Sequence, residues 1–226
     1  MKTLKLLTLT TSAAMLFGAH GALAESSKEL SDGEIKELQE EVNNVMESEL
    51  SGEIKLGEDE SVVFEDIEFE INESVLEEFN YDEEALLEAY AEHAKELRNG
   101  FEFEVEEVSE PEMEEGEIGV QSIVKKGSYY EAKVWAGIPG IGHGHIIQEF
   151  RAQKKGSAIQ NFRFQGNSYD RGFMLGNWSH HRNWFEPHRG SAAYDLYFRG
   201  NMDYVWRGAP ATFTQTYKKN LSSRDL

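Results

Sequence analysis

The sequence predicts an α+β N-terminal acidic segment followed by a mainly-β domain, folded as an antiparallel β-sandwich. The first observation is charge, because residues 25–118 hold 35 acidic and five basic side chains, whereas residues 119–226 hold seven acidic and 15 basic ones. The second is aromatic content, because all four tryptophans and five of the seven histidines follow residue 118. The third is periodicity, because helical spacing of apolar residues occurs in the acidic part, while glycines interrupt short β-type runs in the basic part.

Residues 1–24 are expected to be a secretory signal peptide. Lys2 and Lys5 precede an apolar run that ends in Ala22, Leu23 and Ala24, which is the pattern of such a peptide. The run is too short, and too interrupted by threonine and glycine, for a membrane-spanning helix. The chain has no cysteine, which suits a secreted or periplasmic protein without disulfides and excludes thiolate metal sites and a cysteine nucleophile.

Two helices are expected in the acidic segment, residues 25–108. Ser31 and Glu34 have the spacing of a capping box, and the apolar residues that follow share one helical face, which predicts a helix over residues 32–48. A second run with helical spacing is followed by an asparagine and a glycine, which predicts a helix over residues 82–98.

Strands and a linker complete the acidic segment. Apolar residues approximate alternation over residues 63–71, and they alternate cleanly with glutamates over residues 101–105, as in a sheet with one face in water. Residues 109–118 contain Pro111 and several glutamates, which is typical of a solvated acidic linker. The chain after this linker, residues 119–226, is expected to form the basic sandwich domain.

The basic domain is divided by glycines every eight to twelve residues, a spacing that favours an antiparallel sandwich or barrel. The segments between the glycines are rich in Tyr, Phe, Ile and Val. They predict strands over residues 129–135, 145–153, 157–165, 171–177, 193–199 and 211–217.

The opposite charges of the two parts predict contact between the acidic and basic halves of the chain. An acidic segment can lie against a basic domain and shield it from anionic surfaces that it would otherwise bind. We interpret the acidic segment as an intramolecular partner or pro-segment of this kind.

Short motifs in the basic domain follow one another in an order and spacing that resemble the actinoporins, which are secreted β-sandwich cytolysins with an aromatic membrane-binding surface. The resemblance covers about residues 119–220. It is carried by Gly166, Asn167 and Ser168, by Gly172, Phe173, Met174 and Leu175, by Asn183, Trp184 and Phe185, by Tyr194, Asp195, Leu196 and Tyr197, and by Phe198, Arg199, Gly200 and Asn201.

The resemblance implies a membrane-binding role for aromatic residues. Trp184 and Phe185 would lie on a loop that enters the bilayer interface, and Tyr194 and Tyr197 would hold a phosphocholine headgroup, because ring faces attract a quaternary ammonium. Arg199 is a candidate for the phosphate, as are Arg182 and Arg189. Residues 109–124 do not supply the amphipathic helix with which that family forms a pore, so surface binding is favoured over pore formation.

The segment from Trp178 to His188 is expected to be an exposed functional loop, because it is too polar and too dense in rings for one buried strand. Trp178 is therefore a further candidate for membrane or headgroup binding. Aromatic residues at strand spacing also fill sandwich cores, and that interpretation stays open for each single ring.

A metal site is an alternative. Gly137, His143, His145, Glu149 and Gly156 match the first motif of the cupins, which are metal-binding β-barrels. Two imidazoles on one side of a strand, with a carboxylate further on, can bind a divalent transition metal. The same residues also fit a glycine-rich turn that leads into a strand with two surface histidines.

Other classes are less favoured by the sequence. It contains no HExxH motif and no nucleophile elbow, so we expect a binding protein rather than an enzyme, with no cofactor. Exposed tryptophans would also suit a glycan-binding module, and nucleic acid is a less favoured partner. The preferred interpretation is a secreted toxin-like protein that binds lipid headgroups and oligomerises on membranes.

Overall fold

The computed structural model describes residues 30–109, 127–138, 141–188 and 192–226. The predicted signal peptide and all but the first residue of the predicted linker lie outside the described residues. The helices are α1 (Asp32–Leu50), α2 (Glu73–Glu78) and α3 (Glu83–Asn99). The strands are β1 (Glu53–Lys55), β2 (Glu60–Phe69), β3 (Phe101–Val108), β4 (Ser128–Ile138), β5 (Gly142–Lys155), β6 (Ala158–Phe164), β7 (Tyr169–Met174), β8 (Asn177–His188), β9 (Ala193–Trp206) and β10 (Ala209–Ser222).

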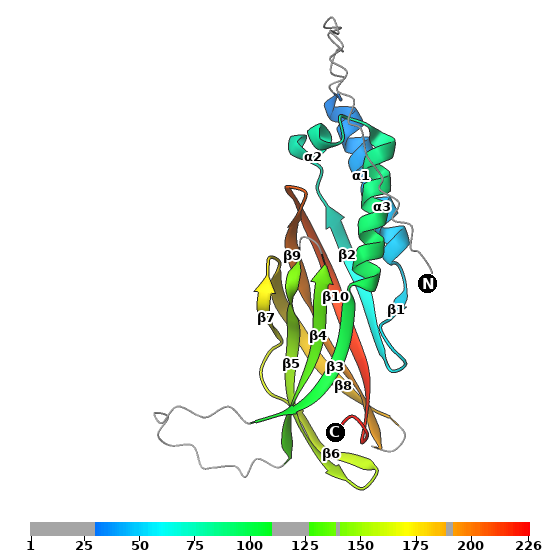
Figure 1. Ribbon diagram of the computed structural model, residues 1–226. Coiled ribbons are helices and arrows are strands. Elements are labelled where there is room, and N and C mark those ends of the chain that lie inside the picture. The colour runs from blue at the N-terminus through cyan, green and yellow to red at the C-terminus, as the bar shows by residue number, and fades with distance from the viewer. Residues whose placement is uncertain (1–29, 110–126, 139–140, 189–191) are drawn as a thin grey trace, which may run out of the picture.

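The strands form two antiparallel sheets (Figure 1). Sheet A has the order β1-β2-β10-β9-β8, and sheet B has the order β3-β4-β5-β6. Strand β7 also pairs with β5, over Gly142–Ile147, whereas β6 pairs with the other end of β5, over Phe150–Lys155. The predicted fold class, an α+β part joined to a mainly-β antiparallel sandwich, is confirmed.

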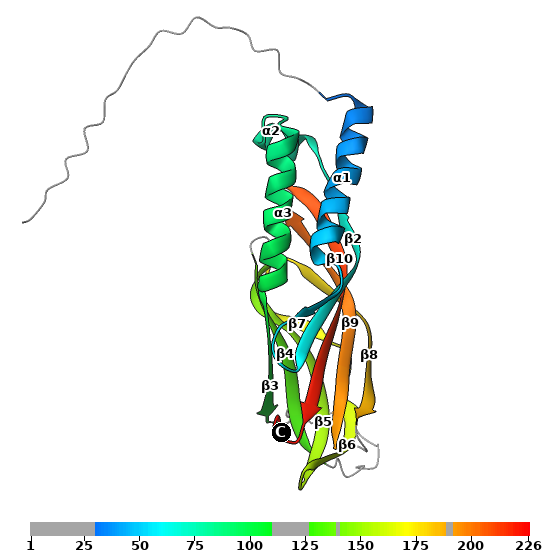
Figure 2. The same ribbon diagram turned by 90° about the vertical axis from the view of Figure 1, so that its right-hand side faces the viewer.

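The helices lie at one end of the two sheets, as both views show (Figure 1, Figure 2). Helix α1 begins with the predicted capping box, in which Ser31 and Glu34 exchange hydrogen bonds. Its buried face carries Leu38, Val42, Met46 and Leu50. Two polar side chains of α1 join it to the end of β2: the backbone N–H of Ile71 donates to Gln39 Oε1 at 2.7 Å, and the N–H of Phe69 donates to Asn43 Oδ1 at 3.0 Å.

The acidic segment is part of both sheets, which corrects the expected division into an acidic unit and a separate basic sandwich. Strand β2 lies between β1 and β10 in sheet A, and β3 pairs with β4 along its whole length in sheet B. The predicted linker therefore connects two neighbouring strands of one sheet. The physical reason is that alternating strands such as β2 and β3 must hydrogen-bond to partner strands and bury their apolar face, and β10 and β4 supply the partners.

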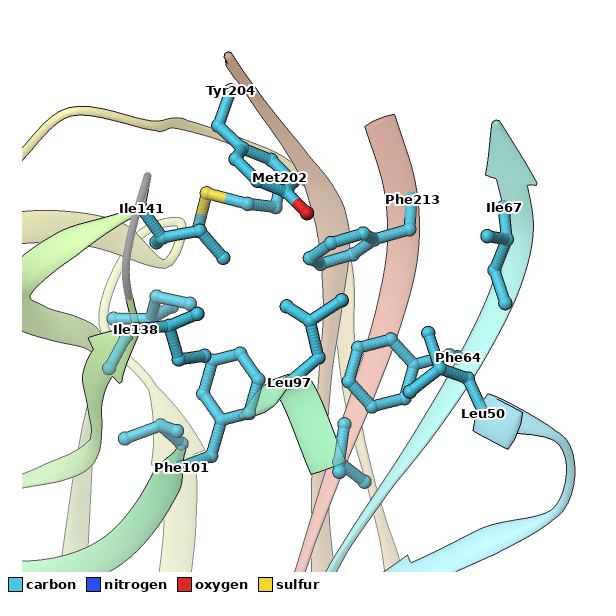
Figure 3. Close-up of a cluster of buried hydrophobic side chains, with 14 of the residues drawn as sticks. Leu50, Phe64, Ile67, Leu97, Phe101, Ile138, Ile141, Met202, Tyr204 and Phe213 are labelled. Carbon is cyan, nitrogen blue, oxygen red and sulfur yellow. The ribbon is translucent and has the colours of Figure 1, made fainter. Parts of the chain in front are cut away.

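The core is continuous from the helices into both sheets (Figure 3). At the junction Leu97 of α3 and Phe101 of β3 lie with Ile138 of β4 and Phe213 of β10 (Figure 3). Gly100 makes the turn from α3 into β3, where a Cβ would overlap the side chain of Ile138. Each fully buried Phe or Leu at this junction contributes about 2 kcal/mol of transfer free energy, so helices and sheets are stabilised by one shared core.

Candidate functional site

The segment expected to be an exposed loop is strand β8, at the edge of sheet A. It pairs with β9 from Asn177 to His188, with an irregularity in the register between His180 and Arg182. The polar run is compatible with a strand because an edge strand can leave most of its side chains in water. The correction matters for function, because neighbouring residues of a strand point to opposite faces.

Trp178 is a core residue and cannot contact a headgroup in this fold. Its side chain is buried, and its Nε1 donates to Ser168 Oγ at 2.9 Å. Its ring lies against the backbone at Gly200, where a Cβ would come within 2.5 Å of Trp178 Cζ2. His180 accepts a hydrogen bond from the backbone N–H of Ser168 at 3.1 Å, and burial lowers the pKa of this histidine.

Trp184 and Tyr197 are cross-strand partners on β8 and β9 and form a parallel stack, with ring centroids 4.7 Å apart and planes 3° apart. The guanidinium of Arg182 lies 4.5 Å from the centroid of the Trp184 ring, and Lys218 Nζ lies 5.7 Å from that of Tyr197. The chain's own cations thus occupy the cation–π positions that a choline group would need.

Arg199 also has partners already. It forms ion pairs with Glu65 and Asp66 of β2. The expected phosphate-binding role would require it to leave both carboxylates.

Phe185 and Tyr194 belong to a different cluster from Trp184 and Tyr197. Their rings lie 5.6 Å apart and pack with Phe162 and Phe164 of β6, at centroid distances of 4.9 Å for Phe185 to Phe162 and 5.4 Å for Tyr194 to Phe162. Phe185 remains 41 % exposed. The six sequence-predicted residues are therefore not assembled into one headgroup cage.

A group of basic residues lies at the end of the sheets away from the helices, where Figures 1 and 2 place β6 and the C-terminus. We call Lys154, Lys155, Arg163 and Arg224 the basic end. Lys154 Nζ donates to an oxygen of the C-terminal Leu226 at 3.4 Å. Lys155 is exposed at the β5–β6 turn, and Arg163 follows on β6.

The cations of the basic end differ from those elsewhere in their partners. Within the part of the chain that the structure describes, Lys155, Arg163 and Arg224 have no ion pair, and the buried Nε and Nη2 of Arg163 have no hydrogen-bond partner. Several cations elsewhere are matched to carboxylates of the acidic segment: Lys133 to Glu106, Arg199 to Glu65, Arg207 to Glu78 and Lys219 to Glu60. Two others have partners of a different kind, because Arg182 lies over the Trp184 ring and Arg98 donates to the backbone oxygen of Glu49. Positive charge without a partner is thus concentrated at the basic end, and the partly exposed ring of Phe185 packs on Phe162 and Phe164, the residues on either side of Arg163.

The residues of the proposed metal site share one face of β5 but do not converge. Glu149 lies four residues beyond His145, which is about 13 Å along a strand. Its carboxylate accepts hydrogen bonds from the hydroxyls of Tyr129 and of Tyr169, the latter at 2.8 Å. Burial, followed by the hydrogen bond to Glu149, raises the pKa of both tyrosines, so both remain donors at neutral pH. His143 and His145 flank the ring of Trp135 instead.

Among the residues with described positions, no three histidine, cysteine, aspartate or glutamate side chains are arranged to hold a metal ion. No helix in those parts of the chain is long and apolar enough to cross a membrane.

No family model, curated protein or solved structure matches this chain. Sequence reasoning missed the basic end, although the pair of lysines before Gly156 is a recognisable signal for a charged hairpin turn.

Proposed function

We propose that this protein binds anionic lipid surfaces through its basic end. The observation that carries the proposal is the combination of unpaired cations with the partly exposed Phe185 at one end of the sheets. A lysine or arginine near an anionic membrane contributes about 1 kcal/mol to binding. An exposed aromatic ring adds apolar contact at the headgroup boundary.

The distribution of charge along the molecule favours an orientation in which the basic end contacts the membrane and the helices point away from it. The helices carry exposed glutamates at the end opposite the basic end, and the whole chain has a formal net charge of −20. Electrostatic interactions are screened beyond about 8 Å at physiological ionic strength. The acidic helices are therefore repelled by an anionic surface only weakly when the basic end touches it, but strongly when they approach it themselves.

The contact surface in this proposal is the basic end, in place of the Trp184 and Tyr197 pair expected from the sequence. Phe185 and Tyr194 belong to that surface, whereas Trp184 and Tyr197 stack on the outer face of sheet A. Membrane damage and oligomerisation on the bilayer are further steps, which surface binding would precede.

Co-sedimentation of residues 25–226 with vesicles tests the proposal. We expect binding to phosphatidylglycerol vesicles at low salt, weaker binding at high salt, and little binding to phosphatidylcholine. Reversing two charges, with Lys154→Glu and Lys155→Glu, should weaken binding by about tenfold or more. The matched control is Lys36→Glu with Lys95→Glu, which makes the same change of net charge on exposed helix positions.

The outcomes separate the alternatives. Equal loss in both double variants would show a response to net charge alone and would refute a local contact, as would the absence of binding to anionic vesicles. Dye release in the same tubes distinguishes surface binding from membrane damage.

The apolar part of the contact is tested by Phe185→Ser, with Val205→Ser as its control. Both side chains are exposed, by 41 % and 58 %, and Val205 lies near the β9–β10 turn. We expect only Phe185→Ser to weaken binding, by about threefold to tenfold. Equal losses of vesicle binding in the two variants would show that Phe185 does not contact the membrane.

A further inference from the structure

A hollow lies on the outer face of sheet B and is independent of the basic end. It has a volume of about 300 Å³ and is lined by Glu102, Phe103, Glu104, Trp135 and His145. His145 and Lys154 are nine residues apart on β5, which places this groove about 30 Å from the basic end along the strand. We call it the Trp135 groove.

The indole of Trp135 is held in a defined position. Gly137, two residues further along β4, leaves the space beside it, because a Cβ at that position would lie 2.8 Å from Trp135 Nε1. On β5 the ring of His145 meets the indole edge-on at 5.0 Å, and the ring of His143 lies at 6.1 Å with a 30° angle between planes. The indole remains partly exposed in the groove.

Two carboxylates stand beside this ring. Glu102 and Glu104 alternate on β3, and Glu102 is the direct cross-strand partner of Trp135. Glu104 Oε1 lies 4.0 Å from Nε2 of His145. An exposed edge strand thus presents two acceptors on the same side as the indole.

The neighbouring cations are already neutralised. Lys133 forms ion pairs with Glu106 and Glu131. Arg171 donates to the two carboxylate oxygens of Glu131 through Nη1 and Nη2, at 3.2 and 2.6 Å. The groove therefore repels anions and attracts cations, while the ring offers a cation–π contact.

We propose that the Trp135 groove binds a small organic cation that carries a primary ammonium group, such as a polyamine. Carboxylates accept hydrogen bonds from an N–H donor, and the indole face stabilises its charge. Together, the carboxylates and the indole favour an ammonium with N–H groups over an anion, and over an uncharged molecule of the same length.

Titration with putrescine, without lipid, tests the proposal. Binding is followed by calorimetry and by the indole N–H resonance that Trp135→Phe removes. Butanediol is the uncharged control of equal chain length, and magnesium chloride at equal ionic strength controls for general attraction to an acidic protein. We expect saturable binding of putrescine with a shift of the Trp135 resonance, and neither effect with butanediol or magnesium.

Paired variants locate the site. Glu102→Gln with Glu104→Gln should weaken putrescine binding by about tenfold, since each lost charge contributes up to about fivefold at an exposed site. The control, Glu40→Gln with Glu47→Gln on α1, removes the same charge and should change binding less than twofold. Butanediol binding equal to that of putrescine, or equal losses in the two double variants, would overturn the proposal.

Discussion

His93 joins helix α3 to the sheets and should make stability depend on pH. Its side chain is 1 % exposed. Its Nε2 lies 2.8 Å from the hydroxyl of Tyr204 on β9, its Nδ1 lies 3.0 Å from a carboxylate oxygen of Glu96, and its ring stacks on Trp206 at 4.8 Å. Burial lowers the pKa of His93, the hydrogen bond and charge of Glu96 oppose this effect, and Arg207 adds to it.

The direction of the pH effect follows from the lowered pKa. As pH falls, the unfolded chain binds the proton first, near the ordinary histidine pKa of about 6.5. The contribution of uncharged His93 to the free energy of unfolding is therefore present above about pH 6.5, and it is lost as pH falls through that value. If the folded state stays unprotonated, the change between pH 7.5 and pH 5.5 is about 1.4 kcal/mol, so we expect about 1 kcal/mol.

His93→Gln removes this titration while it keeps a side chain that can bond to Tyr204. We expect the variant to be less stable than the natural chain at pH 7.5 by about 2 kcal/mol, because the buried ring contacts are lost. The deficit should shrink by about 1 kcal/mol at pH 5.5. Urea unfolding at both pH values measures this difference, and His181→Gln, at an exposed position of β8, is the control. A deficit that is the same at both pH values would refute the assignment.

The remaining predictions concern the shared sheets. A fragment of residues 119–226 should be insoluble or unfolded, because it lacks β2 and β3 and would expose the side chains that they cover. Size-exclusion chromatography and near-ultraviolet circular dichroism test this, and a folded soluble fragment would contradict it. Glu131→Ala should lower the free energy of unfolding by about 2 kcal/mol, because the buried Lys133 then keeps only Glu106 as a partner. A loss below about 0.5 kcal/mol in urea unfolding would show that these ion pairs contribute little to stability.

The sequence predicted elements whose signals are local. Helix α1 was predictable from Ser31 and Glu34, because the capping box and the helical spacing coincide. Most strands of the basic part were predictable from glycines at their ends. Helix α2 was missed because six residues are too few for a helical period to show. Strand β8 was missed because an edge strand with most side chains in water has no apolar alternation.

The candidate site was less predictable because its residues come from distant parts of the chain. Trp184 and Phe185 are adjacent in sequence, yet the strand directs them to different clusters. The basic end combines Lys154 and Arg163, on either side of a turn, with Arg224 near the C-terminus. Only the pairing of strands brings such residues together, so the lysine pair before Gly156 could indicate a charged turn but not the whole group.

The position of β10 determines when this protein can fold. Strand β2 pairs with β10, and Glu60 meets Lys219, so sheet A cannot be completed until β10 has been made. Pairings between such distant residues slow folding, because a long loop must close before any contact stabilises it. If the predicted signal peptide directs export, a newly made chain would stay unfolded long enough to be threaded across a membrane.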